Sequence, residues 1–437
     1  MHARFYTCLI VFCLPVLLPV ALWAQSDDEV NGGIQFNFST PGARSLGMGG
    51  SFIASVDDAT AAYSNPAGLL QLSRAEAFVE GRRWRYEVPF ADRGRVSGGL
   101  SGIGADFIDG VRLGTAESEV EGISYAAFVL PKPKWALAAY YHQVADFESS
   151  FSTGGIFASD SRLFSVQSTY DLDISQAGVA FAYQWPSGVA FGLGVSGYSL
   201  RLNSLTQRYG PRSFHAPADF TRDARVNFQT QTGDDQQVGG TVGLLWDRGG
   251  PVSTGLVYRY GPTFDLDIAT STFSPDVPIP PRQETHFVGV FNLPDVLGGG
   301  ITLRPSQSLT VNLDVSYVLY SELIEEMVVI FPEVQDQGVA AEDFVLDDVA
   351  EVHLGLEYVL TKLRMPIALR AGAWYDPDHR LRSETGPELN QVRFFAGEDE
   401  IHVSAGLGFA LKAFQLDAAA DYSDVATTAT VSAAIRF

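Results

Sequence analysis

Apolar and polar or small residues alternate one by one through many segments of the chain, and this pattern limits the possible folds more than any other feature. The segment LTVNLDVSYVLY (309–320) has apolar side chains at its odd positions, with Thr310, Asn312, Asp314 and Ser316 between them. A period of two residues indicates extended strands with two unlike faces. The same alternation occurs in QAGVAFAYQW (176–185), VAFGLGVSGYSL (189–200), AEVHLGLEYVL (350–360) and TATVSAAIRF (428–437). The chain is therefore predicted to be all-β from about Glu119 to Phe437.

Two classes of all-β protein show this alternation, and the connections distinguish them. A soluble sandwich has apolar residues inside and polar residues outside. Here the second face is rich in Gly, Ala and Ser, which suits a tight lumen. The connections also alternate between short and long, as the periplasmic turns and external loops of outer-membrane barrels do. The short turns are 131–134, 186–188, 247–251, 305–308, 361–366 and 412–413, and the long connections are 85–118, 147–171, 203–234, 262–293, 322–349 and 377–399.

This spacing predicts a transmembrane antiparallel β-barrel of about 14 strands at residues 74–437, with both termini on the periplasmic side. Aromatic residues near the predicted strand ends are typical of interfacial girdles, at Tyr183, Trp185, Trp246, Tyr258, Tyr260 and Tyr358. The C-terminal Phe437 ends an outward apolar face and resembles the signal that the insertion machinery of outer-membrane barrels reads. That machinery is therefore an expected partner.

The charge and composition exclude some partners and favour others. The net charge of −22 argues against nucleic acid or an anionic lipid surface as a partner, because like charges repel. Only 18% of the residues are charged and 12% are aromatic, which favours contact with lipid. After the N-terminus no apolar run reaches the roughly 18 residues that a membrane helix needs. A closed barrel is the other structure that can meet lipid with all its backbone groups paired.

Residues 1–24 have the pattern of a secretory signal peptide. Arg4 precedes the apolar run CLIVFCLPVLLPVALW, and Ala24 marks a small-residue cleavage site. An uncleaved anchor is the alternative, but prolines interrupt the run and no stop-transfer pattern follows. Both cysteines of the chain, Cys8 and Cys13, lie in this segment. The mature chain is therefore expected to hold no disulfide and no thiolate metal site.

Residues 25–73 lie before the predicted barrel and show no sustained alternation. A barrel of about 14 strands leaves an aqueous hole unless something fills it. A short helix could follow a cap at Asp57 or Asp58 and end before Asn65-Pro66. Glycines would let the backbone pack closely against the barrel wall, at Gly47, Gly49 and Gly50. The segment is therefore predicted to be a plug, or hatch, inside the lumen.

Several motifs resemble those of a known family. GARSLGMGG (42–50) and VDDATAAYSNPAGL (56–69) look like the N-terminal hatch of the FadL/OmpP1/TodX family of outer-membrane transport proteins. GGIQFNF (32–38), NLPDVLGGGITLRPSQSLTVNLDVSY (292–317) and LRAGAWYDPDHR (369–380) resemble other recurring family segments. The resemblance implies a plugged barrel that carries long-chain fatty acids or other hydrophobic molecules, with exit through a wall opening made by a kinked strand. The hatch and gating residues that it implies are Gly47, Gly49, Gly50, Asp57, Asp58, Asn65, Pro66, Ala67 and Gly68.

Candidate substrate contacts come from the predicted inward face and from the hatch. Arg259 or Arg370 could hold a carboxylate head group in a bidentate pair, and Phe36, Phe38 and Phe52 could line an apolar pocket. The alternatives are that the arginines form lumen salt bridges and that the aromatic residues only pack the plug. The other charges predicted to point inward are Arg304, Glu351, His353, Glu357, His402, Asp417 and Asp421.

Two external segments are candidates for the first contact with substrate. The run MVVIF (327–331) could form part of a capture groove, or it could extend a strand above the membrane. The arginines of 203–234 could meet a carboxylate or lipopolysaccharide phosphates, or they could be solvated loop charges.

No catalytic residue, metal site or cofactor is predicted. His402 and Ser404 have the His-x-Ser spacing of some outer-membrane phospholipases, but the alternation turns both inward, away from lipid. Helix capping explains Asp57 and Asp58 better than metal binding, because no further spaced ligands follow. We therefore expect a monomeric, passive transporter of hydrophobic molecules, gated by the hatch, in contact with outer-membrane lipid and lipopolysaccharide. The alternative is a structural barrel, such as a secretion-system component that binds a partner protein through its loops or plug.

Overall fold

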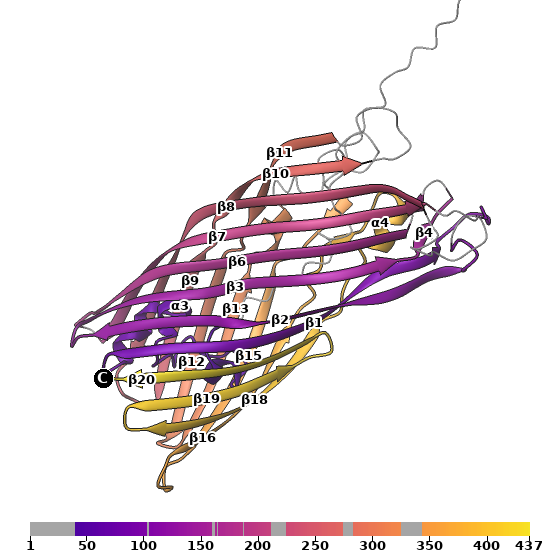
Figure 1. Ribbon diagram of the computed structural model, residues 1–437. Helices are drawn as coiled ribbons and strands as arrows, with labels where there is room; N and C mark the ends of the chain where they lie inside the picture. The colour runs from indigo at the N-terminus through magenta and orange to yellow at the C-terminus, as the bar shows by residue number, and fades with distance from the viewer. Residues whose placement is uncertain are drawn as a thin grey trace, which may run out of the picture.

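A computed structural model describes residues 40–102, 105–159, 162–163, 165–186, 188–210, 224–273, 283–324 and 343–437. These residues form a closed antiparallel barrel of 14 strands (Figure 1), which confirms the predicted fold class. The barrel closes where β20 (Ala426–Arg436) pairs with β1 (Glu76–Arg95) along its first half. No helix in the described part of the chain is long and apolar enough to cross a membrane.

Most barrel strands are unbroken, and each pairs with the strands that come before and after it in the sequence. After β1 they are β2 (Gly110–Pro131), β3 (Trp135–Thr153), β6 (Ser165–Gln184), β7 (Val189–Gly210), β8 (Ala224–Asp247), β13 (Leu309–Val318), β15 (Val349–Leu360), β16 (Ile367–Asp376), β18 (Glu400–Leu411), β19 (Phe414–Tyr422) and β20. Two further strands are each divided in two, as β9 (Val252–Tyr260) with β10 (Thr263–Phe273) and β11 (Gln283–Asn292) with β12 (Val296–Ser306). Pro262 and Pro294 lie at these breaks, where a residue without an N–H cannot continue the ladder.

Short elements lie at the end of the barrel away from the short turns. They are β4 (Gly155–Phe157), β5 (Arg162–Leu163), the 3₁₀ helix η2 (Tyr320–Ile324), β14 (Phe344–Val345), β17 (Arg382–Ser383) and α4 (Glu388–Arg393). Several predicted features lie outside the described residues: the signal peptide 1–24, Phe36, Phe38, the run 327–331 and residues 211–223 of the arginine-rich segment.

The alternation in the sequence becomes an outward apolar face and an inward polar face. In β13, Leu313 and Val315 are 47% and 44% exposed, whereas Asn312 and Asp314 are each 1% exposed. The exposed side chains are the lipid-facing ones, because successive residues of a strand point to opposite sides of the sheet.

Four of the six long connections, 85–118, 147–171, 203–234 and 262–293, are largely strand where the structure describes them, so the prediction of loops there was wrong. The connection 377–399 contains only β17 and α4, and most of 322–349 lies outside the described residues. β1 runs to Arg95, β3 to Thr153 and β7 to Gly210, and β8 begins at Ala224. The backbone pairing continues above the membrane, where outward positions become polar, as at Asp173 and Arg201 in the β6–β7 pair. A strand requires backbone pairing with its neighbours but no apolar outer face, so the loss of alternation in the sequence does not mark the end of the strand.

The segment Thr40–Leu72, here called the N-terminal segment, lies inside the barrel. It contains α2 (Ala43–Leu46), α3 (Ala61–Ser64) and the 3₁₀ helix η1 (Pro66–Gln71). α2 contacts β18, β19 and β20, and η1 contacts β6, β7 and β8. Figure 1 shows α3 within the barrel, at the end that carries the C-terminus. The position of the domain boundary near residue 73 stays a prediction, and β1 begins at Glu76.

The ladder between β2 and β3 ends early. These strands pair only from Tyr125 opposite His142 to Pro131 opposite Ala136. Beyond this point β2 stays paired with β1, and β3 stays paired with β6 after an irregularity between Gln143 and Ala145. Further out, the Ser118 hydroxyl donates to the carbonyl oxygen of Glu148 at 2.5 Å. The stretch of wall between these two contacts has no backbone ladder across it.

Candidate functional site

The N-terminal segment is held against the wall by close backbone contact. Gly49 and Gly50 have φ values of +64° and +77°, a region that suits glycine. A Cβ added to Gly372 of β16 would lie 2.1 Å from the nitrogen of Gly49. A Cβ added to Gly192 of β7 would lie 2.2 Å from the nitrogen of Ala67. Wall and segment therefore approach closely because the wall has a glycine at each of these points.

Side chains of the wall bind the backbone of the segment. Gly49 donates its N–H to the Ser404 hydroxyl at 2.9 Å, and its carbonyl lies 2.8 Å from Nδ1 of His353. Asn312 donates to the carbonyl of Ser51 at 2.7 Å. These bonds satisfy buried backbone groups that form no helix or sheet ladder there.

The turn at Asn65 links the segment to itself and to the wall. Its Nδ2 donates to the carbonyl oxygens of Ile53 and Leu244, at 3.0 and 3.2 Å, and its Oδ1 accepts from the N–H of Ala67 at 3.2 Å. Pro66 then begins η1. At Gly68 an added Cβ would lie 2.3 Å from Val56, so the turn also requires a residue without a side chain.

The two acids of the segment have different partners, and neither caps α3. Asp57 pairs with Arg44. Asp58 is buried and accepts from the N–H and hydroxyl of Thr60, at 2.9 and 2.5 Å. The predicted helix cap was wrong because α3 begins at Ala61, and the carboxylate closes a tight turn on Thr60 instead.

Arg370 is fully engaged in a buried ion-pair network. Its Nε and Nη1 donate to Glu357 and Asp417, each at 2.7 Å. Glu357 also accepts two bonds from Arg44 at 2.9 Å. This network joins β15, β16 and β19 to α2, and it leaves Arg370 in the salt-bridge role that the sequence held open.

Arg259 differs from Arg370 because it has no acidic partner. It is 7% exposed, its Nε has no hydrogen-bond partner, and no described carboxylate lies within ion-pair distance of it. Its guanidinium lies 4.9 Å from the ring centroid of Tyr63 in α3. It lines a cavity between the wall and the N-terminal segment, together with Gly49, Gly50 and His353. A buried cation of this kind suits an anionic ligand group.

Two rings of an aromatic stack, those of His353 and Trp374, line the same cavity. Trp374 lies between His353 and His402, with ring centroids 5.2 and 3.9 Å away. Asp421 accepts from Nδ1 of His402 at 2.6 Å and from Nε1 of Trp374 at 3.3 Å. The Ser404 hydroxyl accepts from Gly49, and no hydrogen bond joins it to His402 among the described residues. The two side chains are therefore not connected as a nucleophile and its base.

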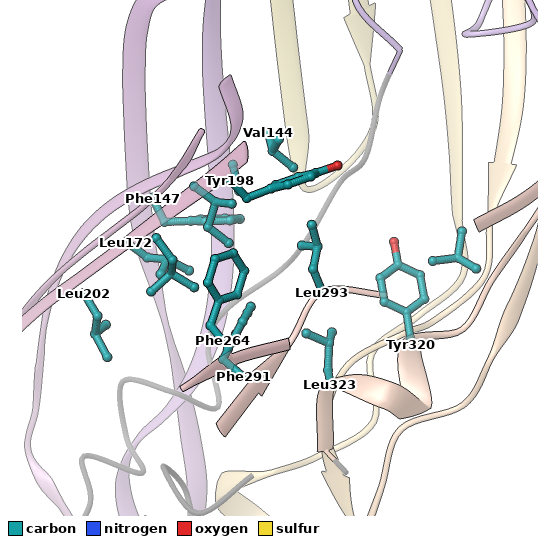
Figure 2. Close-up of a cluster of buried hydrophobic side chains, with 14 of the residues drawn as sticks. Val144, Phe147, Leu172, Tyr198, Leu202, Phe264, Phe291, Leu293, Tyr320 and Leu323 are labelled. Atoms are coloured by element: carbon teal, nitrogen blue, oxygen red, sulfur yellow. The ribbon is translucent and has the colours of Figure 1, made fainter. Parts of the chain in front are cut away.

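An apolar cluster occupies the lumen further from the C-terminal end (Figure 2). It draws aromatic and aliphatic side chains from ten strands and η2, including Val144, Phe147, Leu172, Tyr198, Leu202, Phe264, Phe291, Leu293, Tyr320 and Leu323. Val296 and Val318 belong both to this cluster and to the cavity lining. The cluster and the cavity at Arg259 are therefore continuous.

Sequence reasoning missed this apolar cluster. Many of its members lie in ranges expected to be loops, so their alternation was not followed there. Phe52, which was a candidate pocket residue, packs instead among Met48, Val56 and other buried residues of the segment, with Arg44 at 5.3 Å from its ring centroid.

Comparisons with known proteins match this architecture. The sequence model of the outer membrane protein transport family (OMPP1/FadL/TodX) matches residues 26–434. No curated protein matches the sequence. Similar solved structures include a Pseudomonas aeruginosa FadL homologue, at 12% identity and TM-score 0.62, with 92% of this chain and 100% of that chain covered.

Two toluene transporters are also similar in fold. Pseudomonas putida TodX has 16% identity and TM-score 0.58, and Ralstonia pickettii TbuX has 14% identity and TM-score 0.59. Each alignment covers 92% of this chain and 99% of the other. The family match over nearly the whole chain, together with this barrel, places the protein in the outer membrane, and the chain belongs to the OMPP1/FadL/TodX family of outer membrane transport proteins.

Proposed function

We propose that the protein moves hydrophobic small molecules, including long-chain fatty acids, passively across the outer membrane. The N-terminal segment acts as the hatch, and substrate leaves sideways between β2 and β3. The observation that carries this proposal is the position of the apolar cluster in Figure 2. Through Val296 and Val318 it adjoins the cavity at Arg259, and through Val144 and Phe147 it adjoins the end of the β2–β3 ladder.

The apolar cluster lowers the cost of crossing the polar outer surface. Each Å² of apolar substrate surface removed from water contributes about 25 cal/mol. The names of the toluene transporters of similar fold support hydrophobic cargo for this chain too. A wide open lumen or a large apolar external patch would favour the alternative of a partner-binding barrel. The N-terminal segment instead packs against the wall inside the lumen.

Arg259 is the residue that contacts a substrate carboxylate. Arg370 is already neutralised by Glu357 and Asp417, so a further anion there would meet two carboxylates. Arg259 is buried and forms no ion pair with a described acid, and the two carboxylates that share its cavity, Glu351 and Asp421, lie against His353 and His402. A substrate carboxylate would therefore form a charge-assisted pair with Arg259. The apolar chain of the same molecule would then lie against Val296 and Val318.

The exit lies where the β2–β3 ladder ends. On the lumen side, the ring of Phe147 in β3 lies 5.4 Å from the ring of Tyr86, which belongs to β1, the strand beyond β2. Gly122 of β2 faces open space, since an added Cβ would meet nothing within 4 Å. A rotation of the Phe147 side chain would therefore connect the apolar cluster with the outside of the wall without breaking any strand pairing.

The hatch moves when the hydrogen bonds between the N-terminal segment and the wall break. The residues proposed for gating are those of the glycine-rich contact and of the Asn65 turn: Gly47, Gly49, Gly50, Asp57, Asp58, Asn65, Pro66, Ala67 and Gly68. Gly49 and Gly50 line the cavity, so a substrate beside Arg259 would press on the contact with His353.

Uptake of labelled oleate and toluene by cells that carry the protein tests the proposal. We expect both compounds to enter faster than in cells without it, and a deletion of residues 33–69 to change both rates. Arg259→Gln is expected to lower oleate uptake about tenfold and to leave toluene uptake unchanged, because toluene has no carboxylate. If neither compound enters faster than in cells without the protein, the transport proposal is refuted.

The exit has its own matched test. Gly122→Trp is expected to reduce uptake of both compounds, because the indole fills the stretch of wall without a ladder. Gly197→Trp is the control, since a Cβ there also meets nothing within 4 Å but the residue lies on the β7 ladder. Equal uptake by the two variants would exclude this exit while leaving the transport test intact.

The other proposed partners are the insertion machinery and lipopolysaccharide, which contact the outer surface of the barrel. Phe437 is 71% exposed, and its N–H donates to the carbonyl of Ala75 at 2.9 Å, so its ring is accessible to insertion machinery. Contact with lipopolysaccharide belongs to the outward polar extensions of β6 and β7. The monomeric state stays a prediction.

A further inference from the structure

All four lysines of the chain lie in short turns at one end of the barrel. Lys132 and Lys134 lie between β2 and β3, Lys362 between β15 and β16, and Lys412 between β18 and β19. These turns are at the end that carries the C-terminus (Figure 1), which is the periplasmic side of an outer-membrane barrel. Arg364 adds a fifth cation, and these five residues are here called the basic rim.

Four of the five cations of the basic rim lie beside an outward apolar side chain. Trp135 follows Lys134, Leu363 lies between Lys362 and Arg364, and Leu411 precedes Lys412. These three apolar side chains are 40%, 48% and 56% exposed, as lipid-facing residues are. A long basic side chain next to such an anchor reaches the level of the lipid head groups.

The basic rim has no acid of its own. Within the described residues, no carboxylate forms an ion pair with any of the five cations, whereas Arg304 nearby pairs with Asp247 at 3.4 Å. The whole chain has a net charge of −22, so most of the negative charge lies elsewhere. The net charge of the whole chain therefore does not describe the charge of the basic rim.

We propose that the basic rim binds the anionic head groups of phospholipids in the periplasmic leaflet. The turns lie along one continuous arc of wall, from β3 through β1 to β15. A row of cations at head-group level along such an arc fits a shell of lipids better than a single protein contact. Each cation near an anionic surface strengthens binding about fivefold. Lipid binding by the basic rim does not depend on the proposed transport of hydrophobic molecules.

Fluorescence quenching by brominated phospholipid tests the proposal beside the Lys132–Lys134 turn. The full-length protein carries Trp185→Phe and Trp246→Phe, so Trp135 is the lipid-facing tryptophan that remains among the described residues. It is reconstituted in phosphatidylethanolamine bilayers with phosphatidylglycerol brominated near the glycerol, and in bilayers where the ethanolamine lipid is the brominated one. We expect the phosphatidylglycerol to be enriched at least fivefold around Trp135, and the enrichment to fall at high salt.

The double variant Lys132→Gln/Lys134→Gln is expected to lose this enrichment. Arg112→Gln/Arg201→Gln removes the same charge at the opposite end of the barrel and is expected to keep it. Both pairs of side chains are exposed, so folding, checked by the gel shift on heating, should survive in each. Equal quenching by the two lipids in the parent protein, or enrichment that persists without the two lysines, would overturn the proposal.

Discussion

Changing Glu357 to Gln is expected to destabilise the attachment of the N-terminal segment to the wall. This carboxylate accepts two bonds from Arg44 of α2 at 2.9 Å and one from Arg370 of β16 at 2.7 Å. Its side chain is 6% exposed, so water cannot replace these partners. Removing one member of a buried ion pair costs about 3–5 kcal/mol, because the remaining charges stay buried. We expect a loss of that size in the free energy of unfolding.

Denaturant unfolding in detergent micelles, followed by tryptophan fluorescence, measures this change. Glu119→Gln is the matched control. It removes an ion pair with Arg83 in which the two side chains are 47% and 58% exposed, and such pairs contribute less than about 1 kcal/mol. The comparison keeps the chemistry of the substitution constant and changes only the burial of the site.

A double-mutant cycle assigns the loss to the attachment. If Glu357 holds the segment through Arg44, then Glu357→Gln and Arg44→Met should couple by at least about 1 kcal/mol. Equal unfolding free energies for Glu357→Gln and Glu119→Gln, or no coupling with Arg44, would refute the reasoning.

Three further changes test other parts of the structure. Burial disfavours the charged form of His379, but the hydrogen bond and charge of Asp376 outweigh it and raise its pKa from 6.5 to about 9. Protonated His379 therefore stabilises the fold fully below pH 6.5, and this stabilisation is lost as pH rises through 9. His379→Gln should remove about 3 kcal/mol of pH-dependent unfolding free energy over that range. Gly372→Ala should cost about 1–3 kcal/mol in denaturant unfolding, because its methyl would lie 2.1 Å from Gly49, whereas Gly197→Ala should change stability by less than about 0.5 kcal/mol. Asn65→Ala removes the hydrogen bonds to the carbonyl groups of Ile53 and Leu244 and should speed hydrogen exchange in α3 and η1 about tenfold.

The sequence predicts which side chains face the lumen, but it does not predict which of them meet. A period of two places Glu357, Arg370 and Asp417 on the inward face without any knowledge of the fold. Their pairing depends on the register between strands, which puts Glu357 opposite Arg370. The stack of Trp374 between His353 and His402 likewise combines three strands. The difference between Arg370 and Arg259 also comes from register, because it depends on which acids the neighbouring strands bring alongside.

The two kinds of break in the wall differ in how far the sequence reveals them. Pro262 and Pro294 mark the breaks in the β9–β10 and β11–β12 strands, because a residue without an N–H ends a ladder visibly in the sequence. The end of the β2–β3 ladder has no such marker, because both strands remain paired on their other sides. Register irregularities accompany it in both neighbouring ladders, between Gln143 and Ala145 of β3 and between Glu80 and Gly81 of β1. The alternation of inward and outward side chains breaks at the same place, since Ser124 and Tyr125 of β2 are both buried, as are residues 142–145 of β3. A strict period of two predicts a sealed wall, so a lateral exit has to be sought where this alternation breaks and a strand loses one of its two neighbours.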